Sequence, residues 1–130
     1  MGLDNYAVYG TEHPKYDHTE GTSNSIPDNL FPDNRLCGGM FSGGGNSFRG
    51  KVYNDVVEFF TGYSLYSDIL IPQDVSEIYD ALSQVTEERY ITEFLDSDSY
   101  TYNISYEQFK DLTEWFGVVV KEQGSVISWY

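Results

Sequence analysis

The two ends of the chain alternate apolar and polar residues, and every strong helical pattern lies between them. Residues 3–9 (LDNYAVY) and residues 125–130 (SVISWY) show the period of two that is typical of strands. Strands at both ends with helices between them favour a small sheet that pairs the ends and is covered by helices on one side. We therefore expect an α+β fold, in which three to four helices pack on a small antiparallel sheet.

The first three helices are predicted from apolar stripes and from residues that start or stop a helix. The first spans residues 48–61, with Ser47 as its cap and Gly62 as a left-handed stop. A second helix follows Pro72, and a shorter third is capped by Thr86. The side chains expected to face the core from these two are Val75, Ile78, Tyr79, Leu82 and Val85, then Tyr90, Ile91, Phe94 and Leu95.

The fourth helix has the clearest start. Ser105 and Gln108 have the spacing of a capping box, in which each side chain bonds to the other residue's backbone N–H. The apolar stripe continues to about Gln123, and Gly124 is the expected stop. Gly117 and the β-branched residues after it also fit an alternative, in which the helix ends near Gly117 and a hairpin follows.

One domain, residues 1–130, is expected because a chain of this length can bury a single core. Within it, residues 11–34 are polar and rich in Pro, Asp, Asn and Ser, which favour turns. We expect a long loop there, partly ordered by Tyr16, Ile26, Leu30 and Phe31.

The formal net charge of −14 excludes several classes of function. Direct binding of DNA or RNA requires a basic surface, and an acidic chain without a long apolar run does not favour a membrane. Cys37 is the single cysteine, so neither a disulfide nor a cysteine zinc site forms within one chain. We expect no cofactor and no metal. The start of the sequence also lacks a secretion signal, so these features predict a cytoplasmic protein.

A basic, glycine-rich island interrupts this acidity. No acidic residue occurs between Asp33 and Asp55, and residues 34–54 carry a net charge of +3. Converging backbone N–H groups, a helix start and nearby cations are the parts of an anion cradle, and neighbouring rings could stack on a nucleotide-like ligand. The predicted ligand-binding residues are Gly43, Gly44, Gly45, Ser47, Arg49, Lys51, Arg35, Phe48 and Tyr53.

This island predicts a non-enzymatic binding protein for a small anionic ligand. Residues 45–52 match the phosphate-loop pattern except at Val52, where a nucleotide hydrolase needs Ser or Thr to hold magnesium. Catalysis by Cys37 lacks an assigned base, and His13 and His18 have no helical spacing. A simpler interpretation of the glycines is that they let the backbone pack closely against the core.

The acidity itself supports an alternative function. Glu107, Asp111 and Glu114 recur at helical spacing, which places their carboxylates about 5 to 6 Å apart, near the spacing of nucleic-acid phosphates. Such a face fits an inhibitor or decoy that docks on a basic, nucleic-acid-handling protein. An ordinary soluble surface has the same composition. Self-association into a homo-oligomer stays open.

Two blocks of the sequence carry a resemblance. GLDNYA (residues 2–7) and CGGMFSGGGNSFRGKVY (residues 37–53) resemble a family of small prokaryotic and phage proteins whose role is unassigned. The resemblance implies a protein that acts on its own inside a bacterium or its virus. It transfers no catalytic residue, ligand or partner to this chain.

Overall fold

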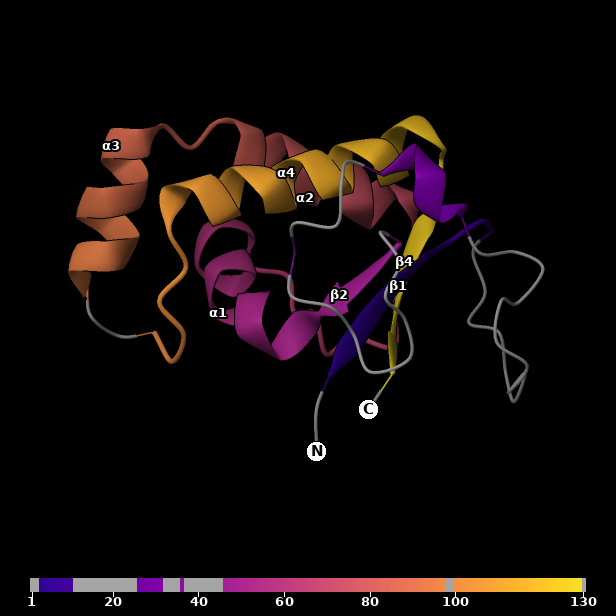
Figure 1. Cartoon of the computed structure of the whole chain (residues 1–130), viewed down its shortest axis with the longest axis horizontal. Helices are drawn as coiled ribbons and strands as arrows, with labels where there is room; N and C mark the ends of the chain where they lie inside the picture. Colours follow the sequence, from indigo (N-terminus) through magenta and orange to yellow (C-terminus); the bar gives the residue numbers. More distant parts are fainter. Residues whose placement is uncertain (1–2, 11–25, 32–35, 37–45, 98–99, 130) are drawn as a thin grey trace.

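The computed structural model describes residues 3–10, 26–31, 36, 46–97 and 100–129 (Figure 1). In chain order the elements are β1 (Asp4–Val8), the 3-10 turn η1 (Asp28–Leu30), β2 (Ser47–Arg49), α1 (Gly50–Thr61), β3 (Ile69–Leu70), α2 (Pro72–Ser83), α3 (Glu87–Arg89), the π-helical turn η2 (Tyr90–Phe94), the 3-10 turn η3 (Leu95–Ser97), α4 (Tyr106–Lys121) and β4 (Ser125–Trp129).

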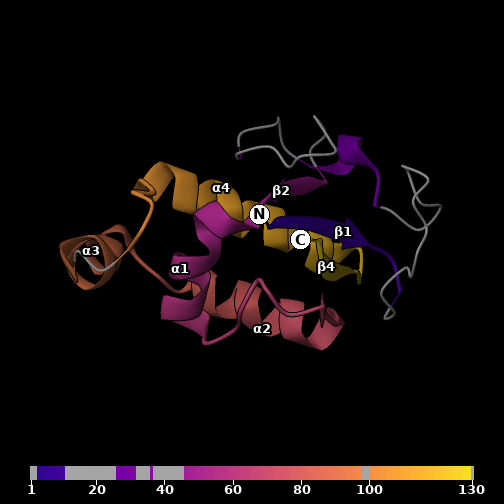
Figure 2. The ribbon, with the colours of Figure 1, turned by 90° about the horizontal axis from the view of Figure 1, so that it is seen from below.

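The four strands form one antiparallel sheet in the order β2-β1-β4-β3. The two terminal strands, β1 and β4, are its central pair and lie side by side in both ribbon views (Figures 1 and 2). Helix α2 packs along α4 and against α1, and it also contacts β3 and β4. The predicted α+β fold, with an antiparallel sheet that pairs both ends, is therefore confirmed.

One face of the sheet belongs to the hydrophobic core. Leu3, Ala7, Phe48 and Val126 point into it and are fully buried. Because side chains alternate across a strand, the intervening residues of β1 and β2 point to the other face. That face carries polar side chains, including Asp4, which is also buried.

The start of α1 differs from the prediction. We expected Ser47 to cap a helix from residue 48, but Ser47–Arg49 forms β2 and the helix begins at Gly50. The cap position is Arg49, which makes no side-chain capping bond. Pairing with β1 decides this, and three residues are too few for alternation to be visible in a sequence. The predicted stop is confirmed, since Gly62 has φ of 79° and donates its N–H to the Glu58 carbonyl.

Helix α2 begins at Pro72 as expected and buries Val75, Ile78 and Leu82. The short third helix is also present, with the Thr86 hydroxyl accepting from the Arg89 N–H at 3.2 Å. It is irregular, because α3 passes directly into a π-helical turn and then a 3-10 turn. Tyr90 and Phe94 are buried from this segment, whereas the prediction that Ile91 faces the core is wrong, since that side chain is 38% exposed.

Helix α4 has the predicted capping box between Ser105 and Gln108. It continues through Gly117 to Lys121, so the alternative with a hairpin after Gly117 is wrong. The left-handed residue after the helix is Gln123, with φ of 56°, and not Gly124. A Cβ on Gly124 would lie 2.6 Å from Ile26 Cδ1 and 2.7 Å from the Val8 carbonyl oxygen, so this glycine serves close packing.

Part of the predicted loop over residues 11–34 also joins the core. Ile26 is fully buried and donates its N–H to the Ala7 carbonyl at 3.1 Å, and Phe31 stacks on Trp115 with 5.3 Å between ring centroids. Leu30 is exposed instead. Residues 11–25 and 32–34 lie outside the described part of the chain.

Candidate functional site

The described residues of the predicted anion site gather where β2 meets α1. Ser47, Phe48 and Tyr53 are buried there, and both rings have no exposed surface. The Phe48 ring meets Trp115 edge-on at 4.7 Å and Tyr53 edge-on at 5.4 Å, so it packs within the core. Both rings are therefore closed to a ligand that arrives from solvent. The remaining predicted residues, Arg35, Gly43, Gly44 and Gly45, lie outside the described residues.

The backbone of this junction is also used by the fold. Ser47, Phe48 and Arg49 lie opposite Tyr6, Asn5 and Asp4 in the sheet. The Asn46 carbonyl accepts the Ala7 N–H at 2.9 Å, which extends the pairing by one residue. A phosphate loop needs free backbone N–H groups between a strand and a helix, whereas here the strand runs through the pattern itself. Residues 45–52 therefore do not form a phosphate loop along their described part.

Gly50, the second glycine of that pattern, is explained by packing. A Cβ at this position would lie 1.7 Å from Asn5 Oδ1 and 2.9 Å from Leu3 Cδ2. The Asn5 amide is held in place because its Nδ2 donates to the Leu65 carbonyl at 3.0 Å and to the Ile127 carbonyl at 3.4 Å. Gly50 thus lets α1 start directly against the central strand.

Two cations remain at the start of α1. Arg49 and Lys51 are half-buried, the first turn of the helix contains no acidic residue, and no side chain caps it. Asp4 lies directly opposite Arg49 in the sheet, so the two side chains point to the same face. Among the described residues, neither cation lies within ion-pair distance of a carboxylate. An anion at this helix end would be favoured by free N–H groups and by both charges.

The helices carry an acidic outer layer. Only two ion pairs join residues within the described ranges, Arg89–Glu93 and Lys110–Glu107. The predicted acidic series on α4 is present, with Glu107 and Glu114 exposed and Asp111 half-buried. The exposed helical carboxylates, counting the turns after α3, are Glu58, Glu77, Asp80, Glu87, Glu88, Glu93, Asp96, Glu107 and Glu114.

One exposed carboxylate of this layer has a tyrosine partner. The Tyr63 hydroxyl donates to Glu77 Oε1, which links the loop after α1 to α2. This hydrogen bond is the main reason that the pKa of Tyr63 is raised to about 12. The same bond, helped by Gln73, lowers the pKa of Glu77 below its ordinary value. The pair therefore favours neutral tyrosine and charged glutamate over a wide pH range.

The aromatic rings at the far end of the helices form a second cluster, which we call the aromatic end. Helix α3 and the turns after it lie at this end, away from the sheet in both ribbon views (Figures 1 and 2). Tyr90 is central, with its ring 4.7 Å from Phe109 and its buried hydroxyl donating to the Ile104 carbonyl. The rings of the aromatic end are Phe59, Phe60, Tyr90, Phe94, Tyr100, Tyr106 and Phe109.

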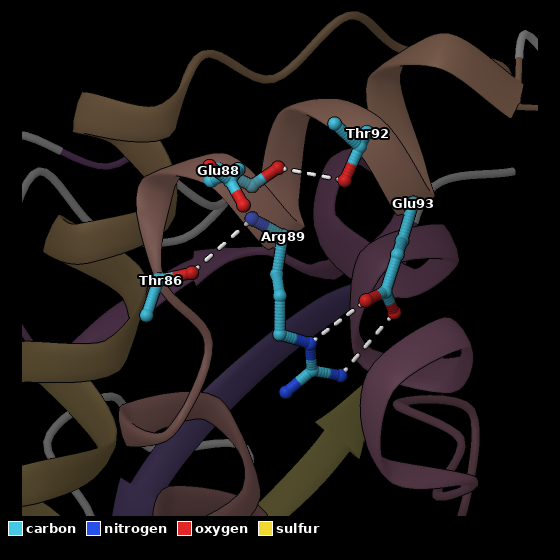
Figure 3. A network of polar contacts seen from close by, with 5 residues as sticks. All are labelled: Thr86, Glu88, Arg89, Thr92 and Glu93. Atoms are coloured by element: carbon cyan, nitrogen blue, oxygen red, sulfur yellow. Dashed lines mark hydrogen bonds and ion pairs between the residues drawn. The ribbon is translucent and has the colours of Figure 1, made fainter.

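Cations on this end are held between a ring and a carboxylate. Arg89 bonds to both carboxylate oxygens of Glu93, at 2.9 and 3.3 Å (Figure 3). Its guanidinium carbon lies 5.9 Å from the Phe60 ring centroid. Lys110 repeats this arrangement with Glu107, at 3.6 Å, and the Tyr106 ring, at 5.4 Å. These groups were not predicted from the sequence. The i,i+4 spacing of Arg89 and Glu93 was the available signal.

Other classes of site have no support in the described residues. No three His, Cys, Asp or Glu side chains of the described ranges gather to hold a metal ion. None of the helices traced there is long and apolar enough to cross a membrane. His13, His18 and Cys37 lie outside these ranges. Comparison with known proteins found no matching family model, no similar curated protein and no similar solved structure.

Proposed function

We propose that this chain is a non-enzymatic binding protein that docks through its acidic helical layer onto a basic, nucleic-acid-handling protein. The observation that supports this is the set of exposed carboxylates on the helices, which outnumber the basic side chains of the same elements. Such a layer attracts a basic surface over a distance of about 10 Å at ordinary salt and raises the association rate. A decoy for nucleic acid uses this same attraction.

Binding to a panel of purified basic nucleic-acid-binding proteins, with acidic proteins of similar size as controls, tests the proposal. Basic partners are expected to bind, to be displaced by duplex DNA, and to be released as salt rises, because an electrostatic contact is screened. Equal binding to acidic proteins, or binding that salt does not weaken, would contradict it.

A variant that neutralises exposed carboxylates sharpens this test. Asp80→Asn, Glu87→Gln and Glu88→Gln together remove three charges from exposed positions, and we expect a weaker, less salt-dependent complex. The matched control changes the neutral, exposed Gln84 and Asn103 to Ala and is expected to bind like the wild type. Equal loss in both variants would argue against a charge effect.

The start of α1 supports a second candidate function, which is the binding of a small anionic, including a nucleotide-like, ligand. Arg49 and Lys51 flank a helix start with no acidic residue and no side-chain cap, and this is the specific observation in its favour. Because Phe48 and Tyr53 are buried, their rings cannot contact such a ligand. Among the described residues of the predicted site, Arg49 and Lys51 would contact it. In either function we place the protein in the cytoplasm, in line with its single cysteine.

A thermal-shift screen with inorganic phosphate and nucleotides tests the second candidate. A bound anion is expected to raise Tm for the wild type, because a ligand that binds only the folded state stabilises it. The double variant Arg49→Gln, Lys51→Gln is expected to abolish this shift in Tm. The control Lys121→Gln changes a cation in the last turn of α4 and is expected to leave the shift intact. No shift with any phosphorylated compound would count against this candidate.

A further inference from the structure

Phe59, on the last turn of α1, is the most exposed large apolar side chain in the described part of the chain, with 47% of its surface open to solvent. Its ring packs edge-on against two other rings, with centroid distances of 4.8 Å to Phe60 and 5.5 Å to Phe94. These contacts orient the ring without covering it. A partner would therefore meet an already placed aromatic side chain, which lowers the entropy lost on binding.

The aromatic end already shows how it holds a cation. Arg89 lies between Phe60 and Glu93, and Lys110 lies between Tyr106 and Glu107. In both cases the ring supplies its negative face and the carboxylate supplies an ion pair. A cation from outside that lies against Phe59 would use the same two kinds of contact.

The charge around Phe59 favours a cationic partner. Residues 55–61 and 87–97 contain six carboxylates and a single cation, Arg89. The last turn of α1 contains no basic residue, so the negative end of the helix dipole is not offset by a cation of its own. A second copy of this acidic chain would meet like charge at the same place, and so a basic partner is the better match.

We propose that Phe59, with the acidic turns of α1, α3 and η2 around it, docks an arginine-rich segment of a partner protein. Arginine is favoured over lysine because its planar guanidinium stacks on a ring while it pairs with a carboxylate. This inference rests on the proposed function and names the surface and the chemistry through which it acts. Glu58, which is exposed beside Phe59, is the nearest carboxylate along the chain.

Fluorescence anisotropy with two labelled peptides tests this surface. One peptide alternates arginine and glycine, and the other replaces each arginine with lysine. We expect the wild type to bind the arginine peptide more tightly, and Phe59→Ala to weaken that binding roughly three- to tenfold. Tyr66→Ala is the matched control, since Tyr66 is another aromatic side chain with 46% exposure, and it is expected to leave binding unchanged.

Phe59→Leu separates the ring from its apolar surface. It retains much of the apolar contact but lacks the aromatic face, so we expect it to lose the preference for arginine over lysine while its urea midpoint stays near that of the wild type. Size measurements at increasing concentration accompany these experiments. A dimer that Phe59→Ala abolishes would assign this surface to self-association and overturn the proposal.

The outcomes separate the surface from the function. If the wild type binds the arginine peptide in a salt-sensitive way and Phe59→Ala binds it equally well, the proposal for the Phe59 surface fails. Docking through the acidic helical layer would still be supported. Equal weakening by Phe59→Ala and Tyr66→Ala overturns the surface in the same way. If the wild type binds neither peptide at low salt, both proposals fail.

Discussion

The junction of β2 with α1 and the aromatic end use similar residues in opposite ways. At the junction, Phe48 and Gly50 are enclosed by the core and by the central strand. At the aromatic end, Phe59 is supported by other rings but open to solvent. The unusual composition of the first region predicted a ligand site there, yet packing accounts for its described glycine and its rings. Composition marks a region as unusual, whereas exposure decides whether that region can bind.

The largest expected difference between the two regions is in the stability lost when Phe48 or Phe59 is replaced by alanine. Phe48→Ala is expected to reduce the free energy of unfolding by about 4 kcal/mol, because it leaves a cavity among Tyr53, Trp115 and Phe116. Phe59→Ala is expected to lower it by about 1 kcal/mol, because the lost ring contacts are at the surface. Urea unfolding measures both values. Equal losses would break the distinction between a buried and a presented ring.

The next largest effect concerns Gly50. Gly50→Ala is expected to destabilise the protein by about 3 kcal/mol, because the new Cβ collides with Asn5 and displaces its buried hydrogen bonds. Gly62→Ala is the control. It has open space around it and a φ of 79°, so only backbone strain is expected, at about 1 kcal/mol. If Gly50→Ala were as mild as Gly62→Ala, packing would not explain this glycine and an anion-binding role would gain support.

A smaller loss of stability is expected when the helix cap at the aromatic end is removed. Thr86→Ala deletes the acceptor for the Arg89 N–H and is expected to lower stability by about 1 kcal/mol. Because α3 continues only as irregular turns, amide exchange is expected to rise first in residues 87–97. Ser105→Ala removes the cap of the regular helix α4 and serves as the comparison. Faster exchange across the whole chain in Thr86→Ala would contradict a local effect.

The smallest expected change is in the titration of an exposed pair on the acidic layer. In the folded protein Tyr63 has a pKa raised to about 12 and Glu77 a lowered one. The hydrogen bond therefore contributes its full stabilisation of the folded protein at pH values above the unfolded-state pKa of Glu77 and below the ordinary tyrosine pKa of about 10. Its contribution is lost as pH falls through the lowered pKa of Glu77, or rises through that of Tyr63.

Ultraviolet absorbance of tyrosinate checks this pair. The difference between the titration curves of the wild type and Tyr63→Phe is expected to show one group with a pKa of about 12. Glu77→Gln removes the charged acceptor and is expected to move that group towards the ordinary tyrosine value. A difference curve centred near the ordinary value in the wild type would show that the bond does not persist in solution.

Local signals predicted several elements well. The Ser105–Gln108 capping box, Pro72 at the start of α2 and the stop at Gly62 were all readable, because each depends on residues within one turn of helix. The stripes of α2 and α4 were readable for the same reason. The terminal strands also appeared as alternating segments, which led to the confirmed fold class.

Other features depend on contacts between distant segments and were missed. β2 and β3 have three and two residues, and they exist because β1 and β4 offer edges for pairing. Gly124 has the residue type of a helix stop, but its place against Ile26 and Val8 requires a glycine for packing. The left-handed residue after the helix is Gln123. The candidate site shows the same division. The sequence predicted the two cations, Arg49 and Lys51, but it did not predict that Phe48 and Tyr53 are buried.

The sequence by itself determined the acidity, the amphipathic helices with their ends, and the pairing of the two terminal strands in an α+β fold. These properties follow from net charge and from interactions between near neighbours along the chain. Only the tertiary structure decided that β2 runs through the glycine-rich pattern, that Asn5 requires Gly50, and that Phe59 is exposed while Phe48 is buried. The physical reason is that burial and sheet pairing depend on which distant segments meet, and a local pattern does not specify those neighbours.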